Sequence, residues 1–234
     1  MSTSDFTKYQ VDLVICLDVT ASMGDILENV KRSALEMQAR LERAANVARK
    51  SISDLRLQVI PFRDLEWEGS EAIWSSPWYD LPAQSEKLKE FLDTLKAKGG
   101  GSAPESALEA LWTAMNSSWR ERGERRRSII VMMTDASAHE LGRDEYELEQ
   151  SLFPTPKNLD ELNMRWGRYG DEEESVFGAV NINNRRLVLL APDLSPWNDI
   201  GDKWERTVWL PSMAGAGLSE LDWDAIARLI VTTV

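Results

Sequence analysis

Apolar residues occur along the chain in short continuous runs. Between these runs lie stretches in which apolar residues recur every three or four positions. Residues 11–17 form a nearly unbroken apolar run, rich in β-branched side chains, that ends at Asp18. This pattern is typical of a parallel strand covered on both faces. Further runs predict strands at residues 55–62, 128–134, 186–191 and 207–210. A stretch at 73–79, broken by Pro77, predicts a short irregular edge strand, because proline cannot donate to a sheet.

Between these runs, apolar positions recur at steps of three and four residues, the spacing of one helical face. The longest stripe follows Gly24 and consists of Leu27, Val30, Ala34, Met37, Leu41, Ala44 and Ala48. Other helices are predicted at residues 84–98, from Ser102 to about Trp119, at 159–166, and at 219–231 with Ser219 as the cap. Strands that alternate with helices predict an α/β fold with a doubly wound, mostly parallel sheet and one short antiparallel edge strand.

The pattern contains no internal linker, so we expect a single domain over residues 1–234. Residues 139–184 lack clear strand periodicity and contain Pro154 and Pro156. We interpret this segment as an insertion between core strands.

Charge and composition narrow the choice of partners. The formal net charge is −12, from 39 acidic and 27 basic side chains, which disfavours nucleic acid and anionic lipid as partners. No apolar run approaches the roughly 20 residues of a membrane span, and the start lacks the features of a secretory signal. The one cysteine, Cys16, lies inside an apolar strand and is interpreted as a buried hydrophobic residue. We therefore expect a cytoplasmic protein.

Polar residues with oxygen donors follow the predicted strands. Asp18, Thr20 and Ser22 come directly after the first strand, Asp135 follows the strand at 128–134, and Ser102 follows three glycines. In a doubly wound sheet, loops at the carboxyl ends of strands gather at one edge and hold ligands. Oxygen donors without soft ligands favour Mg²⁺, with Mn²⁺ or Ca²⁺ as alternatives.

These loops resemble the metal-ion-dependent adhesion site of von Willebrand factor type A domains. The resemblance covers nearly the whole chain and is strongest to an intracellular branch, through Phe62-Arg63-Asp64 and the Gly-rich loop that ends in Pro104-Glu105. It implies that Asp18, Thr20 and Ser22 are ligands, that Ser102 is the variable ligand, and that Asp135 acts through a water. Thr20 stands where serine is commoner, and Ser102 where the family usually has threonine or aspartate.

Each of these residues also has an ordinary structural interpretation. Ser22 with Asp25, and Ser102 with Glu105, have the spacing of helix capping boxes. Asp18 and Asp135 could interact only with helix dipoles. His139 and Asp64 fit either a supporting role near the metal loops or an ordinary surface position.

Three functions fit the sequence. The first is a non-enzymatic adaptor whose metal binds an acidic residue of a partner protein, by resemblance within a multi-protein stress-response or defence-type assembly. The second is a structural subunit with a degenerate metal site. The third is a Mg²⁺-dependent phosphotransferase or hydrolase, which is disfavoured because Thr20 stands where such enzymes carry a second aspartate. The sequence does not indicate an oligomeric state.

Overall fold

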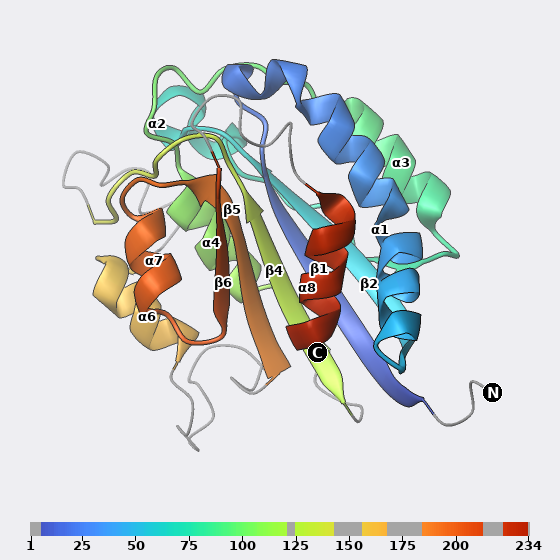
Figure 1. Cartoon of the computed structure of the whole chain (residues 1–234). Helices are drawn as coiled ribbons and strands as arrows, with labels where there is room; N and C mark the ends of the chain where they lie inside the picture. Colours follow the sequence, from blue (N-terminus) through green and yellow to red (C-terminus); the bar gives the residue numbers. More distant parts are fainter. Residues whose placement is uncertain (1–5, 121–124, 143–155, 168–183, 213–221, 234) are drawn as a thin grey trace.

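The computed structural model describes residues 6–120, 125–142, 156–167, 184–212 and 222–233. They form one six-stranded sheet in the order β3-β2-β1-β4-β5-β6 (Figure 1). The strands are β1 (Thr7–Asp18), β2 (Lys50–Phe62), β3 (Tyr79–Leu81), β4 (Arg126–Met133), β5 (Arg185–Pro192) and β6 (Thr207–Ser212). All neighbouring pairs are parallel except β2 and β3. The expected α/β fold with an antiparallel edge strand is confirmed.

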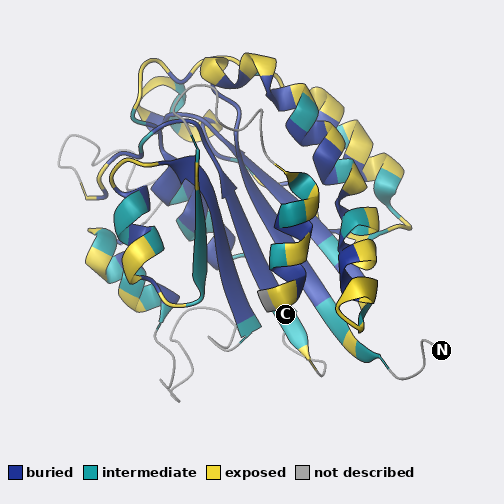
Figure 2. Ribbon diagram, in the orientation of Figure 1, coloured by how far each residue is buried: buried dark blue, intermediate teal, exposed yellow. Residues whose placement is uncertain are grey.

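Helices cover both faces of the sheet. The described helices are α1 (Leu27–Val47), α2 (Leu65–Glu68), α3 (Ser85–Thr94), α4 (Ala107–Met115), α6 (Leu159–Trp166), α7 (Trp197–Lys203) and α8 (Trp223–Thr233). One face packs against α1, α3 and α8, and the other against α2, α4, α6 and α7. Figure 2 shows the central strands buried between these two layers.

The apolar side chains of β1 pack in the core on both faces of the sheet, because successive side chains of a strand point to opposite faces. Leu13 and Ile15 pack in the core with α1, whereas Val14 and Cys16 pack in the core with α4. The thiol of Cys16 is fully buried, and its Sγ lies 3.6 Å from the carbonyl oxygen of Ala110. Burial raises the pKa of this thiol well above its usual range. The expectation of a buried cysteine is confirmed.

Several predicted boundaries differ from the structure. The edge strand was predicted at 73–79, but β3 lies just after Pro77, and Ile73 makes only an isolated bridge to Phe62. The helix predicted from Ser102 begins at Ala107. Helix α7 was not predicted at all, while α6 lies where its pattern placed it. The predicted cap Ser219 lies outside the described residues, and Asp222 instead accepts a hydrogen bond from the Ala225 amide at 2.9 Å.

Strand order brings the polar loops together. β1 pairs with β4 on one side and β2 on the other, so the loops after Asp18, Phe62 and Met133 leave the same edge of the sheet. No helix among the described residues is both long enough and apolar enough to cross a membrane.

Candidate metal centre

Asp18 is the last residue of β1 and is completely buried. Its Oδ1 accepts hydrogen bonds from the Thr20 backbone N–H at 2.9 Å and from the Thr20 hydroxyl at 2.6 Å. Its Oδ2 accepts a hydrogen bond from the Thr134 hydroxyl at 2.7 Å, across from β1 to the end of β4. The loops that follow the two central strands therefore meet at this carboxylate.

The same network extends to the second acid. The Ser22 Oγ lies 3.1 Å from the Thr20 Oγ1 and donates a hydrogen bond to the Asp135 Oδ1 at 3.0 Å. Asp18, Thr20, Ser22 and Asp135, called here the Asp18 cluster, thus form a continuous chain of oxygen-bearing side chains. The Asp135 Oδ2 is buried and has no hydrogen-bond partner among the described residues.

Electrostatics at the cluster disfavour its negative charge. Burial raises the pKa of Asp18 to about 6, and Asp135 adds to this effect, while the hydrogen bonds from Thr20 and Thr134 oppose it. Within the part of the chain that the structure describes, no lysine, arginine or histidine forms an ion pair with either aspartate. A divalent cation would offset this charge and bind the oxygen that has no partner. The donors present therefore fit a hard metal ion.

Glu105 is a further acid of this region that sequence reasoning did not treat as a site residue. It is 4% exposed, and its Oε2 has no hydrogen-bond partner among the described residues. Burial raises its pKa to about 9, with further contributions from Asp18, Asp64, Glu68 and Asp135. Its position at the end of the Gly-rich loop could have indicated a site residue, but its spacing from Ser102 is also that of a capping-box partner.

The Gly-rich loop packs directly on the Asp18 cluster. The Lys98 amide donates to the Val19 carbonyl, and the Ala21 amide donates to the Gly99 carbonyl, both at 3.1 Å. Gly100 has φ +86°, and a Cβ there would lie 2.4 Å from the Thr20 Cγ2 and 2.9 Å from the Glu105 Oε1. Only glycine fits this close approach.

Ser102 does not join the cluster. It is exposed, and no hydrogen bond joins its side chain to another described residue. The alternative of a capping box with Glu105 is wrong, because α4 begins at Ala107 after Ser106, whose side chain makes no cap hydrogen bond. The capping box of Ser22 with Asp25 is also wrong, since Ser22 lies inside the 3₁₀ helix η2 (Ala21–Asp25) and bonds Asp135 instead.

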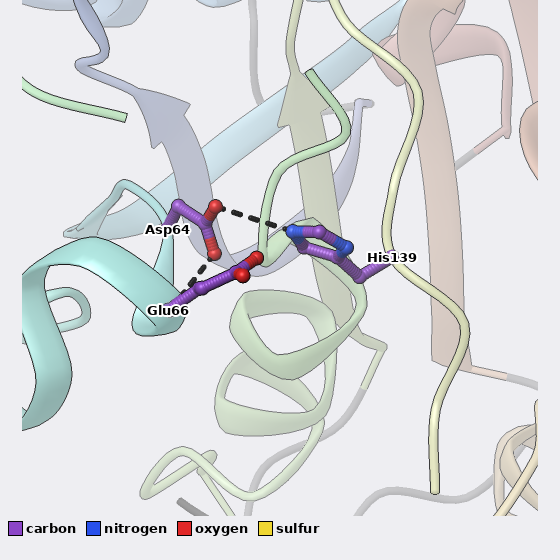
Figure 3. A group of neighbouring side chains, drawn as sticks. All are labelled: Asp64, Glu66 and His139. Carbon is purple, nitrogen blue, oxygen red and sulfur yellow. Dashed lines mark hydrogen bonds and ion pairs between the residues drawn. The ribbon is translucent and has the colours of Figure 1, made fainter. Parts of the chain in front are cut away.

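Asp64 and His139 lie buried beside this region, so the interpretation of either as an ordinary surface residue is wrong. The His139 Nε2 is 3.2 Å from the Asp64 Oδ2, and the Asp64 Oδ1 accepts a hydrogen bond from the Glu66 amide (Figure 3). The Asp64 Oδ1 also accepts a hydrogen bond from the Ser106 hydroxyl. Both Asp64 and Asp18 raise the pKa of Glu105, so its carboxyl lies within electrostatic range of both.

A mostly parallel sheet between two helical layers, with oxygen donors gathered at its carboxyl edge, defines a doubly wound α/β domain, a class of fold whose ligands bind in the loops at that edge. A family model described as a von Willebrand factor A domain matches residues 12–150, more than half of the chain. The chain belongs to this family. Its domains act in general in protein interactions, and many hold a divalent metal.

Solved structures show the same fold at low sequence identity. The pilus adhesin SpaC from Lactobacillus rhamnosus GG, in its open conformation, matches with a TM-score of 0.51 and 11% identity, over 97% of this chain and 30% of that chain. Proximal thread matrix protein 1 from the mussel byssus matches with a TM-score of 0.51 and 10% identity, over 97% of this chain and 49% of that one. The chain thus spans less than half of either protein. A search of curated proteins gave no match.

Proposed function

We propose that the chain is a non-enzymatic protein-binding module that holds one divalent metal, Mg²⁺ in the first instance, at Asp18, Thr20, Ser22 and Asp135. The observation that carries this proposal is the buried Asp135 Oδ2, which lacks a hydrogen-bond partner among the described residues, beside a second buried carboxylate. Two carboxylates would offset the charge of the ion, and two hydroxyls would add oxygen ligands without adding charge, which leaves positions of an octahedral shell open.

The bound metal would supply a Lewis-acidic position that accepts a carboxylate from a partner protein. The chain's own contribution is orientation: Thr134 holds one oxygen of Asp18, and Thr20 holds the other. The Gly-rich loop packs against Thr20 and encloses one side of the cluster. We further propose that residues 139–184, as an insertion of a single-domain cytoplasmic protein, help select the partner within a multi-protein assembly.

The metal proposal is tested by calorimetric titration of chelator-treated protein with Mg²⁺. The wild type should show one saturable site, and Asp18→Ala should bind at least about 100-fold more weakly, because loss of even outer-shell partners costs about 10–100-fold. Asp93→Asn is the matched control, since Asp93 is an exposed aspartate on α3. Equal binding by wild type and Asp18→Ala would falsify the site.

Partner binding needs a separate measurement. Immobilised protein in Mg²⁺ should retain a specific protein from a native lysate. EDTA should release that protein, and the immobilised Asp18→Ala variant should fail to retain it. Retention that is unchanged by EDTA and by the Asp18→Ala substitution would support a structural subunit whose metal site has degenerated.

A further inference from the structure

A second group of metal-binding side chains lies beside the Asp18 cluster but does not share its residues. Asp64, Glu66 and His139, called here the His139 cluster, each offer a ligand atom, and these atoms lie within 4.8 Å of one another. Figure 3 shows the three side chains converging from α2, from Asp64 at its N-terminal cap and from the loop after β4. Asp64 and His139 are buried, whereas Glu66 is exposed, so one side of the cluster is open to solvent.

The spacing of two of these donors suits a metal ion. Ligand bonds of about 2.0–2.2 Å place two donors of a tetrahedral site roughly 3.4 Å apart. The His139 Nε2 and the Asp64 Oδ2 are 3.2 Å apart. Glu66 needs only a side-chain movement to join them, because its exposed carboxylate already lies within the same 4.8 Å.

Outer contacts hold the Asp64 carboxylate in place. Its Oδ1 accepts hydrogen bonds from the Ser106 hydroxyl at 3.2 Å and from the Glu66 amide at 3.0 Å. The Oδ2 therefore remains directed at His139. Metal sites commonly use such outer hydrogen bonds to fix their ligands.

A third acid, Glu105, lies beside the cluster. The backbone of Glu105 accepts a hydrogen bond from the His139 amide at 2.9 Å, and its buried carboxyl has an oxygen without a hydrogen-bond partner among the described residues. Arg63 is the adjacent cation in the sequence, but its guanidinium lies over the Trp74 ring, 5.0 Å from the centroid. No ion pair joins Arg63 to an acid in the described ranges.

We propose that Asp64, Glu66 and His139 bind a second divalent ion, and that the imidazole makes this site selective for a transition-metal ion such as Zn²⁺ over Mg²⁺. One imidazole and two carboxylates form a donor set that suits zinc, whereas Mg²⁺ prefers oxygen alone. The ion would join α2 to the loop that carries His139, and so fix the segment around Glu105 next to the Asp18 cluster.

The test is a calorimetric titration of the whole chelator-treated chain with Zn²⁺, with a Mg²⁺ titration of each variant in parallel. We expect the wild type and Asp18→Ala to bind Zn²⁺ with similar affinity at this site. Glu66→Gln and His139→Ala should weaken Zn²⁺ binding at least tenfold while the Mg²⁺ isotherm keeps its affinity. Glu66 is exposed, so its variant tests the site even where loss of buried His139 disturbs folding.

Glu71→Gln is the matched control, because Glu71 is an exposed acid a short distance along the chain and belongs to neither cluster. The proposal is overturned by a wild type that binds no Zn²⁺, by Glu66→Gln and His139→Ala that bind it as the wild type does, or by loss of Zn²⁺ binding in Asp18→Ala. Absence of Mg²⁺ binding in the wild type would overturn the Asp18 site alone, so the two failures are distinguishable.

Discussion

At the scale of single residues, the Gly-rich loop differs in structure from what the family resemblance implies. Family resemblance implies Ser102 as the variable ligand, whereas the structure leaves Ser102 exposed and brings Glu105 inward. We expect Ser102→Ala to change the Mg²⁺ dissociation constant less than about threefold, because a hydroxyl outside the cluster contributes little to binding. Calorimetry on Ser102→Ala beside Asp18→Ala checks this. A loss of tenfold or more in Ser102→Ala would restore Ser102 as a ligand.

Gly100 gives a second test at this scale. Gly100→Ala places a methyl group against Thr20 at a backbone φ of +86°, where a side chain costs about 1–2 kcal/mol before any clash is counted. We expect a lower melting temperature and Mg²⁺ binding that is weaker by roughly tenfold, since Thr20 must move. Gly24→Ala is the control, because nothing lies within 4 Å of the added Cβ. Equal effects from both substitutions would contradict the close packing at Gly100.

The sequence predicted the Asp18 cluster better than its surroundings, and the reason is local. Asp18, Thr20 and Ser22 lie within five residues that follow one buried strand, so the end of the strand places them together. Glu105, Asp64 and His139 come from three separate segments. Their proximity depends on loop contacts such as the bridge between Glu105 and Ala138, which has no periodic signal in the sequence.

At the scale of elements, β1 is anchored near its middle as well as at its end. Asp12 is 3% exposed and accepts hydrogen bonds from the Arg56 Nε at 2.8 Å, from the Arg56 Nη2 at 2.7 Å and from the Arg120 amide at 2.8 Å. The Arg120 guanidinium adds an ion pair at 3.0 Å. This carboxylate therefore joins β1 to β2 and to the segment after α4.

Removal of this carboxylate takes from the partly buried Arg56 its only ion pair among the described residues. Arg120 loses one partner but keeps ion pairs with Asp54 at 2.8 Å and Asp80 at 3.7 Å. Asp12→Ala should lower the free energy of unfolding by about 3–5 kcal/mol, measured by urea denaturation. Its Mg²⁺ affinity should be unchanged, because the six residues to Asp18 span about 20 Å of strand. Asp93→Ala, which removes an exposed pair with Lys89 on α3, should cost no more than about 0.5 kcal/mol. A cost below about 1 kcal/mol for Asp12→Ala would contradict the anchoring role.

Elements were predicted well where burial is continuous and poorly where it is not. The runs of β1 and β4 and the stripe of α1 are long and buried, so their periods stand out. Helix α7 is only seven residues long and follows Pro196, and β3 has three residues at the edge of the sheet. Such short elements depend on contacts with distant residues rather than on their own pattern.

At the scale of the whole molecule, the chain is strongly acidic, and buried carboxylates lie together at the carboxyl edge of its sheet. The net charge of −12 favours cations over anions near the surface, and the carboxyl edge of the sheet brings Asp18 and Asp135 into one hydrogen-bonded cluster. The architecture was predictable because alternating strands and helices allow few topologies. The donor positions were not predictable to the ångström, since hydrogen bonds across β1 and β4 fix them.

A crystal structure of the wild type grown with Mn²⁺, which replaces Mg²⁺ at oxygen sites and scatters anomalously, tests the metal centre most directly. We expect an anomalous peak bonded by Asp18, Thr20 and Ser22, on the side of the Asp135 Oδ2. No peak between Asp18 and Asp135 in crystals grown with saturating Mn²⁺ would contradict the metal centre, whatever is found at the His139 cluster.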